Sequence, residues 1–258
     1  MPTRPRIDFA GYHHIMNRGV NKTNIFNSDT DKNSFMKILN KNAIIYKVVV
    51  HDYVLMDNHF HLLIETKEEN LSSFMRILGA NYTQYFNKKY GRVGHLYQDR
   101  FKSKFITTEE YLYNLIKYIE YNPIDAKISN EIGEYKYTLA SLILNKKNIY
   151  QCCKQSQLLN EFDLKTLMEF LEIELTKEQI VTLNKKENLK KVLEDIIYTK
   201  TKEFKEHFLD IDTKPKRNKA IIKAYSDGYS QVQISKHLNL STSLVSKVVK
   251  SGFLTPGV

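Results

Sequence analysis

The sequence contains no tryptophan and only two cysteines among its 258 residues. Because Cys152 and Cys153 are adjacent, they fit neither a disulfide framework nor the C-x-x-C spacing of zinc sites, and we interpret them as reduced thiols. No apolar run approaches the ~20 residues that a membrane span needs, and the first residues lack the apolar core of a signal peptide. These absences argue against a secreted scaffold and a membrane-embedded chain, and they predict a cytoplasmic protein.

Acidic residues are the scarcer charged type. The chain carries 39 Lys and Arg against 29 Asp and Glu, which gives a net charge of +10. Residues 1–124 hold 17 basic and 12 acidic side chains, residues 125–212 hold 14 and 16, and residues 213–258 hold 8 and 1. The positive excess therefore lies at the two ends, and it favours a polyanionic partner such as nucleic acid.

The spacing of apolar residues predicts seven elements in the first half of the chain. A turn-forming pair, Asp57-Asn58, joins two strands into an antiparallel hairpin, and the last helix is expected to end before Pro123. The order strand, helix, strand, strand, helix, strand or short hairpin, helix predicts an α+β domain with a central antiparallel sheet, of the ferredoxin-like or split βαβ kind. The expected ranges are 12–19, 30–45, 46–56, 59–65, 70–91, 94–106 and 107–123.

The remainder of the chain has helical spacing and little strand signal. We expect a helical connector over residues 146–212, with helices in 163–174 and 187–198. A polar stretch with a proline, 212–217, then leads to a compact unit. The predicted organisation is thus a first domain over 1–145, the connector over 146–212 and a C-terminal domain over 213–258.

The C-terminal segment has the rhythm of a helix-turn-helix. Ser230 and Ser241 are placed to cap two helices, and Asn239 occupies the tight-turn position that Gly usually takes. The alternative is a helical tail that packs on a partner; the local excess of basic residues favours DNA. The expected core is Ile234, Leu238, Leu240, Val245 and Val248, which leaves Thr242, Ser243, Ser246 and Lys247 to face the major groove of duplex DNA.

Two histidines interrupt an apolar run in the strand 59–65. Because side chains alternate along a strand, His59 and His61 share one face, and the apolar residues between them share the other. We expect the apolar face to meet the helices and the histidines to face outward. Two imidazoles about 7 Å apart at Cα can reach one metal ion, whereas the alternative is a pair of solvent-facing histidines.

A metal site needs a third ligand. Glu65 lies about 13 Å beyond His61 along the strand, too far to share a metal, and Asp57 is nearer but falls in the turn. The predicted helix 107–123 carries Tyr118 and Asn122 four residues apart, hence on one face. Taken alone, these two are better explained as a core tyrosine and a helix-ending asparagine before proline.

Four segments together resemble a known family. NRGVNKTNIF (17–26), MDNHFHLLIE (56–65), GHLYQDRFKSKF (94–105) and YLYNLIKYIEYNP (111–123) are similar, in order and spacing, to the single-tyrosine HUH transposases, especially the REP-associated tyrosine transposases. The resemblance covers roughly residues 5–145. One departure is that the tryptophan-containing segment usual after the domain is replaced by YKYTLASL, without tryptophan.

The resemblance implies specific roles for residues. His59 and His61 would bind a divalent metal, Mg²⁺ or Mn²⁺, with Asn122 as the third ligand, and Tyr118 would attack DNA to form a 5′-phosphotyrosine and a free 3′-OH. The insertion-sequence branch has Gln where this chain has Asn122, so Asn matches the REP-associated branch. The implied partner is single-stranded or hairpin DNA, and a monomer or a homodimer would both be compatible with this chemistry.

A basic segment with interleaved aromatic residues, 86–105, lies between the two histidines and the tyrosine in the sequence. Cations that contact phosphates and rings that stack on unpaired bases are typical of single-stranded DNA binding, although a solvated basic hairpin with core aromatics is the alternative. The candidate DNA contacts are Lys88, Lys89, Arg92, Arg100, Lys102 and Lys104, with Arg18 and Asn58 as further candidates.

The sequence therefore predicts a metal-dependent transposase that nicks and rejoins DNA and carries an added helix-turn-helix, with DNA and not a membrane as its partner. A replication initiator or relaxase with the same chemistry is one alternative. A sequence-specific DNA-binding regulator derived from a transposase is another.

Overall fold

The computed structural model describes residues 7–185, 192, 203–209, 211–227 and 229–254. The chain forms two compact units, Met1–Leu189 and Lys190–Val258. The helix expected over 187–198 lies, apart from residue 192, outside the described residues. None of the described helices is long and apolar enough to cross a membrane.

The first unit is built on a four-stranded sheet with the order β2-β3-β1-β4. Its strands are β1 (Gly11–Arg18), β2 (Val48–Met56), β3 (His59–Thr66) and β4 (Lys102–Phe105), and every pairing is antiparallel. The predicted α+β class with a central antiparallel sheet is confirmed. Of the expected segment 94–106, only β4 forms a strand, preceded by a loop that touches the end of β1 through a single bridge between Gly19 and Tyr97.

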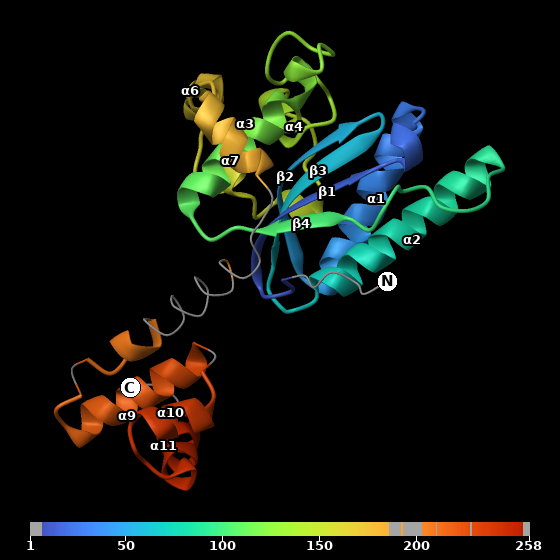
Figure 1. Cartoon of the computed structure of the whole chain (residues 1–258). Coiled ribbons are helices and arrows are strands. Elements are labelled where there is room, and N and C mark those ends of the chain that lie inside the picture. Colours follow the sequence, from blue (N-terminus) through green and yellow to red (C-terminus); the bar gives the residue numbers. More distant parts are fainter. Residues whose placement is uncertain (1–6, 186–191, 193–202, 210, 228, 255–258) are drawn as a thin grey trace. The chain divides into compact units, whose positions relative to one another are not determined.

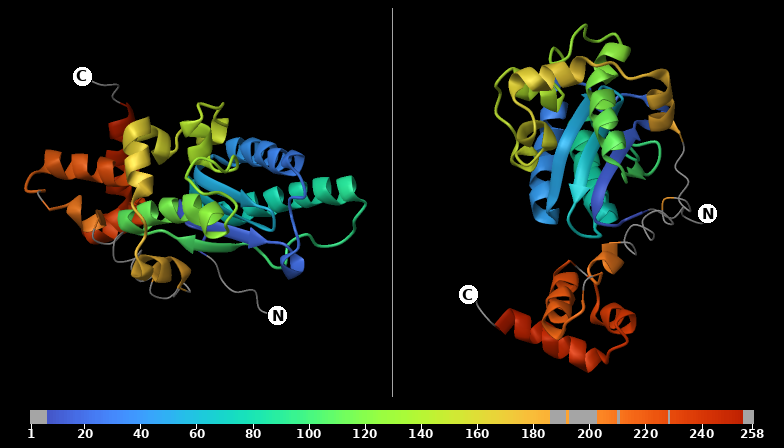
Figure 2. Two further views of the ribbon diagram at one scale, coloured as in Figure 1. Left: turned by 90° about the horizontal axis from the view of Figure 1, so that it is seen from above. Right: turned by 90° about the vertical axis from the view of Figure 1, so that its left-hand side faces the viewer.

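Helices cover both faces of this sheet. The long helices α1 (Asp29–Tyr46) and α2 (Leu71–Tyr90) lie side by side on one face, as Figures 1 and 2 show. Helix α3 (Glu109–Asp125) packs on β2 and β3 from the other face, and α4 (Leu139–Leu144) packs beside it on β2. The shorter elements of this unit are η1 (Val20–Lys22), η2 (Gln151–Cys153), α5 (Gln157–Asn160), α6 (Leu164–Glu172) and α7 (Lys177–Asn184).

The prediction that the histidine face of β3 points outward is wrong. His61 is only 6% exposed, because α3 lays its apolar side on this face of the sheet. Thr108 starts α3 by accepting a hydrogen bond from the backbone N–H of Tyr111, and Glu109 and Glu110 favour the positive end of the helix dipole. The apolar side that α3 buries consists of Leu112, Leu115, Ile116 and Ile119. The face is therefore covered at His61, whereas His59 at the start of the strand stays half-buried.

The expected end of α3 before Pro123 is also wrong. The helix continues through Pro123 to Asp125, and its C-cap is Ala126. Proline removes one backbone donor, but its ring is buried, and the backbone N–H of Ala126 still donates to the carbonyl of Asn122 at 3.0 Å. Asn122 is thus an interior helical residue, one turn after Tyr118.

Gly19 ends β1 where the chain turns sharply into η1. A Cβ at this position would lie 2.1 Å from the carbonyl oxygen of Thr23, closer than any side chain tolerates. The glycine therefore lets the chain fold back directly after Arg18, which leaves the Arg18 side chain at the end of the sheet.

The second unit contains α9 (Lys214–Ser226), α10 (Gln231–His237) and α11 (Thr242–Leu254). Ser230 caps α10 by accepting a hydrogen bond from the N–H of Gln233, and Asn239 adopts the left-handed conformation with φ 51°. Both features agree with the sequence prediction for the turn. The buried apolar side chains of the second unit include Phe208, Ile221, Ala224, Ile234, Val245, Val248 and Val249, with Leu238 and Leu240 packed against them.

Candidate functional site

The two strand histidines and the helix tyrosine meet between β3 and α3. The ring centroids of His59 and His61 lie 5.3 Å apart, with the rings edge to face. The Tyr118 ring lies 5.6 Å from that of His61, again edge-on. The register of β3 presents both imidazoles to the helix, and the position of Tyr118 on α3 places its ring against them. The structure therefore brings these three residues together.

A third histidine, which the sequence reasoning did not identify, supports this group. His14 on β1 is 1% exposed, and its Nε2 lies 2.9 Å from Nδ1 of His61, with the rings stacked. This contact uses one nitrogen of His61 and leaves its Nε2 for another ligand. The alternation within YHHIMNR puts His14 on one face of its strand, but the pairing of β1 with β3 is a long-range fact that the local pattern does not contain.

Burial keeps these imidazoles neutral. Desolvation and the nearby Lys104 lower the pKa of His14 to about 3. Desolvation, with His14 and His59 adding to the effect, holds the pKa of His61 well below its usual range. Burial also lowers the pKa of His59, against the opposing effect of a hydrogen bond to Asn122. Neutral imidazoles have a free lone pair, so these side chains are ready to bind a metal at neutral pH.

Amide side chains orient the pair. Nδ1 of His59 lies 2.6 Å from Oδ1 of Asn58, so Asn58, a predicted DNA contact, fixes the ring of His59. Nδ2 of Asn122 donates to the carbonyl of Tyr118 at 2.5 Å, and the Asn122 side chain also bonds His59. Two imidazole nitrogens and an amide oxygen form a donor set that suits a divalent ion such as Mn²⁺.

The two carboxylates considered as third ligands, Asp57 and Glu65, are engaged elsewhere. Asp57 accepts from Nζ of Lys32 at 2.6 Å, and Glu65 pairs with His51 and Lys67 at the far end of β3. Within the described residues, no group of three or more His, Cys, Asp or Glu side chains is placed to hold a metal. A third protein ligand would therefore have to be of another type, and Asn122 is the residue in position.

Helix α3 is joined to the sheet by a buried acid pair. Glu120 hydrogen-bonds Asp52 on β2, and its Oε1 accepts from the backbone N–H of Ala140 at 2.9 Å. Both carboxyls are buried, and desolvation raises the pKa of each, so the pair retains a proton and bonds as an acid to a carboxylate. This contact fixes the position of α3 along β2, and with it the position of Tyr118. The sequence reasoning missed it.

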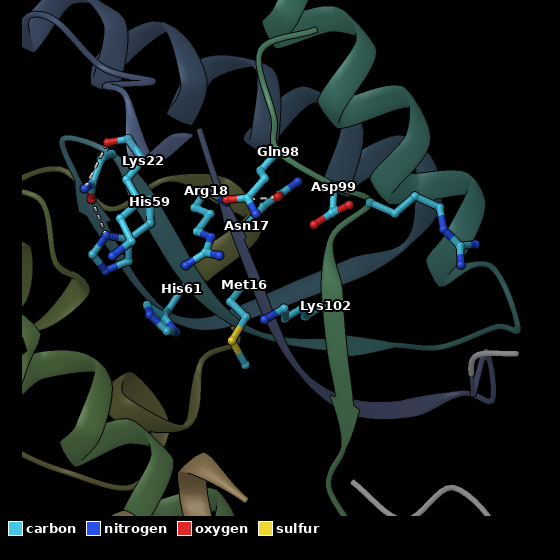
Figure 3. A pocket seen from close by; sticks show the side chains of 11 residues that line it. Met16, Asn17, Arg18, Lys22, His59, His61, Gln98, Asp99 and Lys102 are labelled. Carbon is cyan, nitrogen blue, oxygen red and sulfur yellow. Dashed lines mark hydrogen bonds between the residues drawn. The ribbon is translucent and has the colours of Figure 1, made fainter. Parts of the chain in front are cut away.

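A cavity of about 330 Å³ opens beside the histidines (Figure 3). The antiparallel register pairs Arg18 with His59 and Met16 with both His61 and Lys102, so these side chains share one face of the sheet. Four of the predicted DNA contacts, Arg18, Asn58, Arg100 and Lys102, line this cavity beside the histidine pair. The cavity is lined by Met16, Asn17, Arg18, Lys22, Asn58, His59, His61, Gln98, Asp99, Arg100 and Lys102.

The other predicted DNA contacts lie in different surroundings. Lys88 and Arg92 are exposed at the end of α2, whereas the ammonium of Lys89 is held by Asp31 at 2.6 Å. Nζ of Lys104 donates to the carbonyl of Leu183 at the end of α7. At the start of α11, in the second unit, Thr242, Ser243 and Lys247 are exposed and Ser246 is partly buried.

The buried His14 predicts an acid-sensitive fold. Because its folded-state pKa is depressed to about 3, the unfolded chain takes up this proton first as the pH falls below 6.5, and stability is lost between pH 6.5 and about 3. The free energy of unfolding of the wild type minus that of His14→Gln should fall by about 1 kcal/mol per pH unit below 6.5 and stay constant above it. Urea titrations in the presence of a metal chelator measure the free energy of unfolding of both proteins. The titration of the Asp52–Glu120 pair contributes equally to both and cancels in the difference. A difference that does not change with pH would contradict a neutral, buried His14.

The first unit is an α+β domain with an antiparallel sheet, and its histidine pair lies against a helix tyrosine. Residues 9–122 match the family model described as "Transposase IS200 like". This segment, which contains His59, His61, Tyr118 and Asn122, is similar to the IS200-like transposases. A comparison with curated proteins gave no match.

Solved structures similar to this chain include two transposases. The REP-associated tyrosine transposase bound to a REP hairpin is 14% identical, with a TM-score of 0.48, and the match covers 57% of this chain and 86% of that one. A putative transposase from Deinococcus radiodurans is 15% identical, with a TM-score of 0.34 and coverage of 46% and 95%. The tRNA(His) guanylyltransferase from Saccharomyces cerevisiae is 11% identical, with a TM-score of 0.35 and coverage of 69% and 78%.

Proposed function

We propose that this transposase cleaves and rejoins single-stranded, hairpin-bearing DNA through a covalent 5′-phosphotyrosine on Tyr118, with a divalent metal held by His59, His61 and Asn122. The observation that carries the proposal is the contact of the Tyr118 ring with His61, 5.6 Å between centroids, at the edge of a cation-lined cavity. A tyrosine that served only the core would not need to lie beside a neutral imidazole that lines a cavity.

The phenol of Tyr118 is not activated by its surroundings. Burial and the nearby Asp125 raise the pKa of Tyr118, so the group is protonated at neutral pH. In the reaction, the O–P bond to Tyr118 forms, the P–O3′ bond breaks, and the phenolic proton leaves as the 3′ oxygen gains one. A bound divalent ion would supply Lewis-acid polarisation of the scissile phosphate.

The protein's own side chains would position the substrate. Arg18, Lys22 and Lys102 lie on the walls of the cavity and attract the phosphates on either side of the scissile bond. The acid pair Asp52–Glu120 holds α3, so Tyr118 keeps its position relative to the histidines during attack. Rejoining reverses the same step, because the phosphotyrosine ester retains the energy of the broken bond.

A strand-specific adduct assay tests the proposal. Hairpin-bearing single-stranded DNA, labelled at either the 5′ or the 3′ end, is incubated with the full chain and Mn²⁺ or Mg²⁺. Only the 3′-labelled fragment should become covalently attached to the protein, and the released 5′ fragment should carry a free 3′-OH. Attachment of the 5′-labelled fragment would reverse the polarity that we propose, and no adduct with either label would contradict the function.

For the second unit we propose that residues 213–258 bind duplex DNA as a helix-turn-helix, with α11 in the major groove. The exposed residues Thr242, Ser243 and Lys247 near its N-terminus support this role, together with the local excess of basic residues. On this proposal the chain consists of a catalytic domain, 1–145, a helical connector, 146–212, and this DNA-binding domain.

Deleting residues 213–258 should weaken duplex binding and flatten its dependence on salt, because 8 basic residues are removed against 1 acidic residue. Lys247→Ala in the full chain should lower the slope of log affinity against log salt by about 1. Adduct formation on single-stranded DNA should survive both changes. Fluorescence anisotropy over a salt series provides the measurement, and undiminished duplex binding by the truncated chain would favour a packing role.

A further inference from the structure

We infer that Asp99 reads the base next to the scissile phosphate, by accepting a hydrogen bond from an exocyclic amino group in the cavity beside His59 and His61. The chemical consequence is a preference at that position for cytosine, adenine or guanine, which carry an exocyclic amino group, over thymine. This inference rests on the proposed function and goes further, since it names the residue that selects the nucleotide.

The cavity has the size and lining of a site for one nucleotide. Its volume of about 330 Å³ lies at the small end of ligand sites, which run from about 300 to 1,000 Å³. Met16 provides an apolar surface at the centre, on which a base can lie. Figure 3 shows His59 and His61 at one side of the cavity and Gln98 and Asp99 at the other. A nucleotide whose phosphate lies at the histidines would therefore direct its base towards Asp99.

Asp99 is an exposed residue and the one carboxylate among the residues that line this cavity. Arg18, Lys22 and Lys102 all favour a phosphate, whereas Asp99 repels one. Within the part of the chain that the structure describes, the Asp99 side chain has no hydrogen-bond or ion-pair partner, so balancing a neighbouring cation does not explain it. Among the described residues, Asp99 and the histidines do not form a group of three or more His, Cys, Asp or Glu side chains that could hold a metal.

The backbone holds Asp99 in place. The N–H of Gln98 donates to the carbonyl of Arg18 at 3.0 Å, and the N–H of Val20 donates to the carbonyl of Leu96 at 3.1 Å. Leu96 is 1% exposed and Phe101 is 8% exposed, so the loop is anchored in the core on both sides of Asp99. A side chain on a fixed loop can discriminate between bases without first being ordered.

The chemistry of the bases then sets the direction of the preference. A carboxylate only accepts hydrogen bonds, and it accepts from the exocyclic amino group of cytosine, adenine or guanine, whereas thymine has no such group. A good contact of this kind discriminates between bases by roughly 5- to 100-fold. Thymine in the cavity would leave the charged Asp99 desolvated and without a donor.

Binding measurements test this without requiring cleavage. The full chain with Tyr118→Phe is titrated against short oligo-dC and oligo-dT, which present the same base in every register, and affinity is followed by fluorescence anisotropy. We expect oligo-dC to bind roughly 5- to 100-fold more tightly, and Asp99→Ala to reduce this ratio to near one. Glu69→Gln, which removes an exposed carboxylate at the other end of β3, is the matched control and should leave the ratio unchanged.

The outcomes separate the two proposals. Equal binding of oligo-dC and oligo-dT by the parent protein, or a preference that persists in Asp99→Ala, would overturn the role of Asp99 and leave the nuclease proposal intact. Loss of the preference in Asp99→Ala, with an unchanged ratio in Glu69→Gln, would support it. In a chain with Tyr118, absence of any covalent adduct would instead count against the proposed function alone.

Discussion

Tyr118→Phe should abolish covalent adduct formation and cleavage, by roughly a thousandfold or more, while binding of single-stranded DNA stays nearly unchanged. The substitution removes only the attacking oxygen and keeps the ring that packs edge-on against His61. Gel analysis of end-labelled hairpin DNA in the presence of Mn²⁺ measures the adduct, and anisotropy with the same DNA measures binding.

Tyr121→Phe is the matched control on the same helix. The Tyr121 hydroxyl lies at the surface, 3.5 Å from the carbonyl of Glu172 and away from the histidines. Its loss should leave the adduct unaffected. If Tyr118→Phe still formed the adduct at the wild-type rate, the nucleophile would be another residue, and Tyr111, Tyr113 and Tyr121 would be the next to substitute.

His61→Ala should lower Mn²⁺ affinity by roughly 100-fold or more and remove metal-dependent cleavage, because it deletes one of two imidazole ligands. Calorimetry or electron paramagnetic resonance of added Mn²⁺ gives the affinity directly. Since the change also leaves Nε2 of His14 buried without its partner, at a cost of about 1–3 kcal/mol, His59→Ala at the more open end of the site provides a second variant.

The role of Asn122 as the third ligand can be tested independently of the two histidines. Asn122→Ala should weaken Mn²⁺ binding, and Asn122→Asp should partly restore it by supplying an oxygen. His95→Ala, which removes an exposed histidine away from the pair, is the control and should bind Mn²⁺ as the wild type does. Unchanged binding in His61→Ala and His59→Ala would refute the metal site, whereas unchanged binding in Asn122→Ala alone would leave the pair and exclude this third ligand.

Much of the local structure could be read from neighbouring residues. The alternation in HFHLLIE placed His59 and His61 on one face of β3, and the four-residue spacing placed Tyr118 and Asn122 on one face of α3. The cap at Ser230 and the left-handed Asn239 were also predictable, because caps and turns depend on residues only a few positions apart.

The errors at α3 have a common physical reason. Pro123 disfavours a helix locally, but its buried ring and the hydrogen bonds after it outweigh the lost donor, so the helix continues. In the same way, two histidines in an apolar strand suggest an exposed face, but the apolar side of α3 covers it. Proline in a helix interior costs about 3 kcal/mol, and packing between distant segments can match or exceed such a cost.

The sequence by itself determined the strand and helix order, the spacing of the histidine pair and the helical face shared by Tyr118 and Asn122, because each depends on periodicity within one element. Only the tertiary structure decided which residues meet across elements. The β1–β3 register brings His14 to His61, the pairing of β2 with α3 brings Asp52 to Glu120, and the loop before β4 carries Asp99 to the cavity. His14 and His61 are 47 positions apart in the chain, Asp52 and Glu120 are 68 apart, and Asp99 lies about 40 positions after the histidine pair. Which residues meet over such distances is set by how whole faces pack rather than by any local pattern.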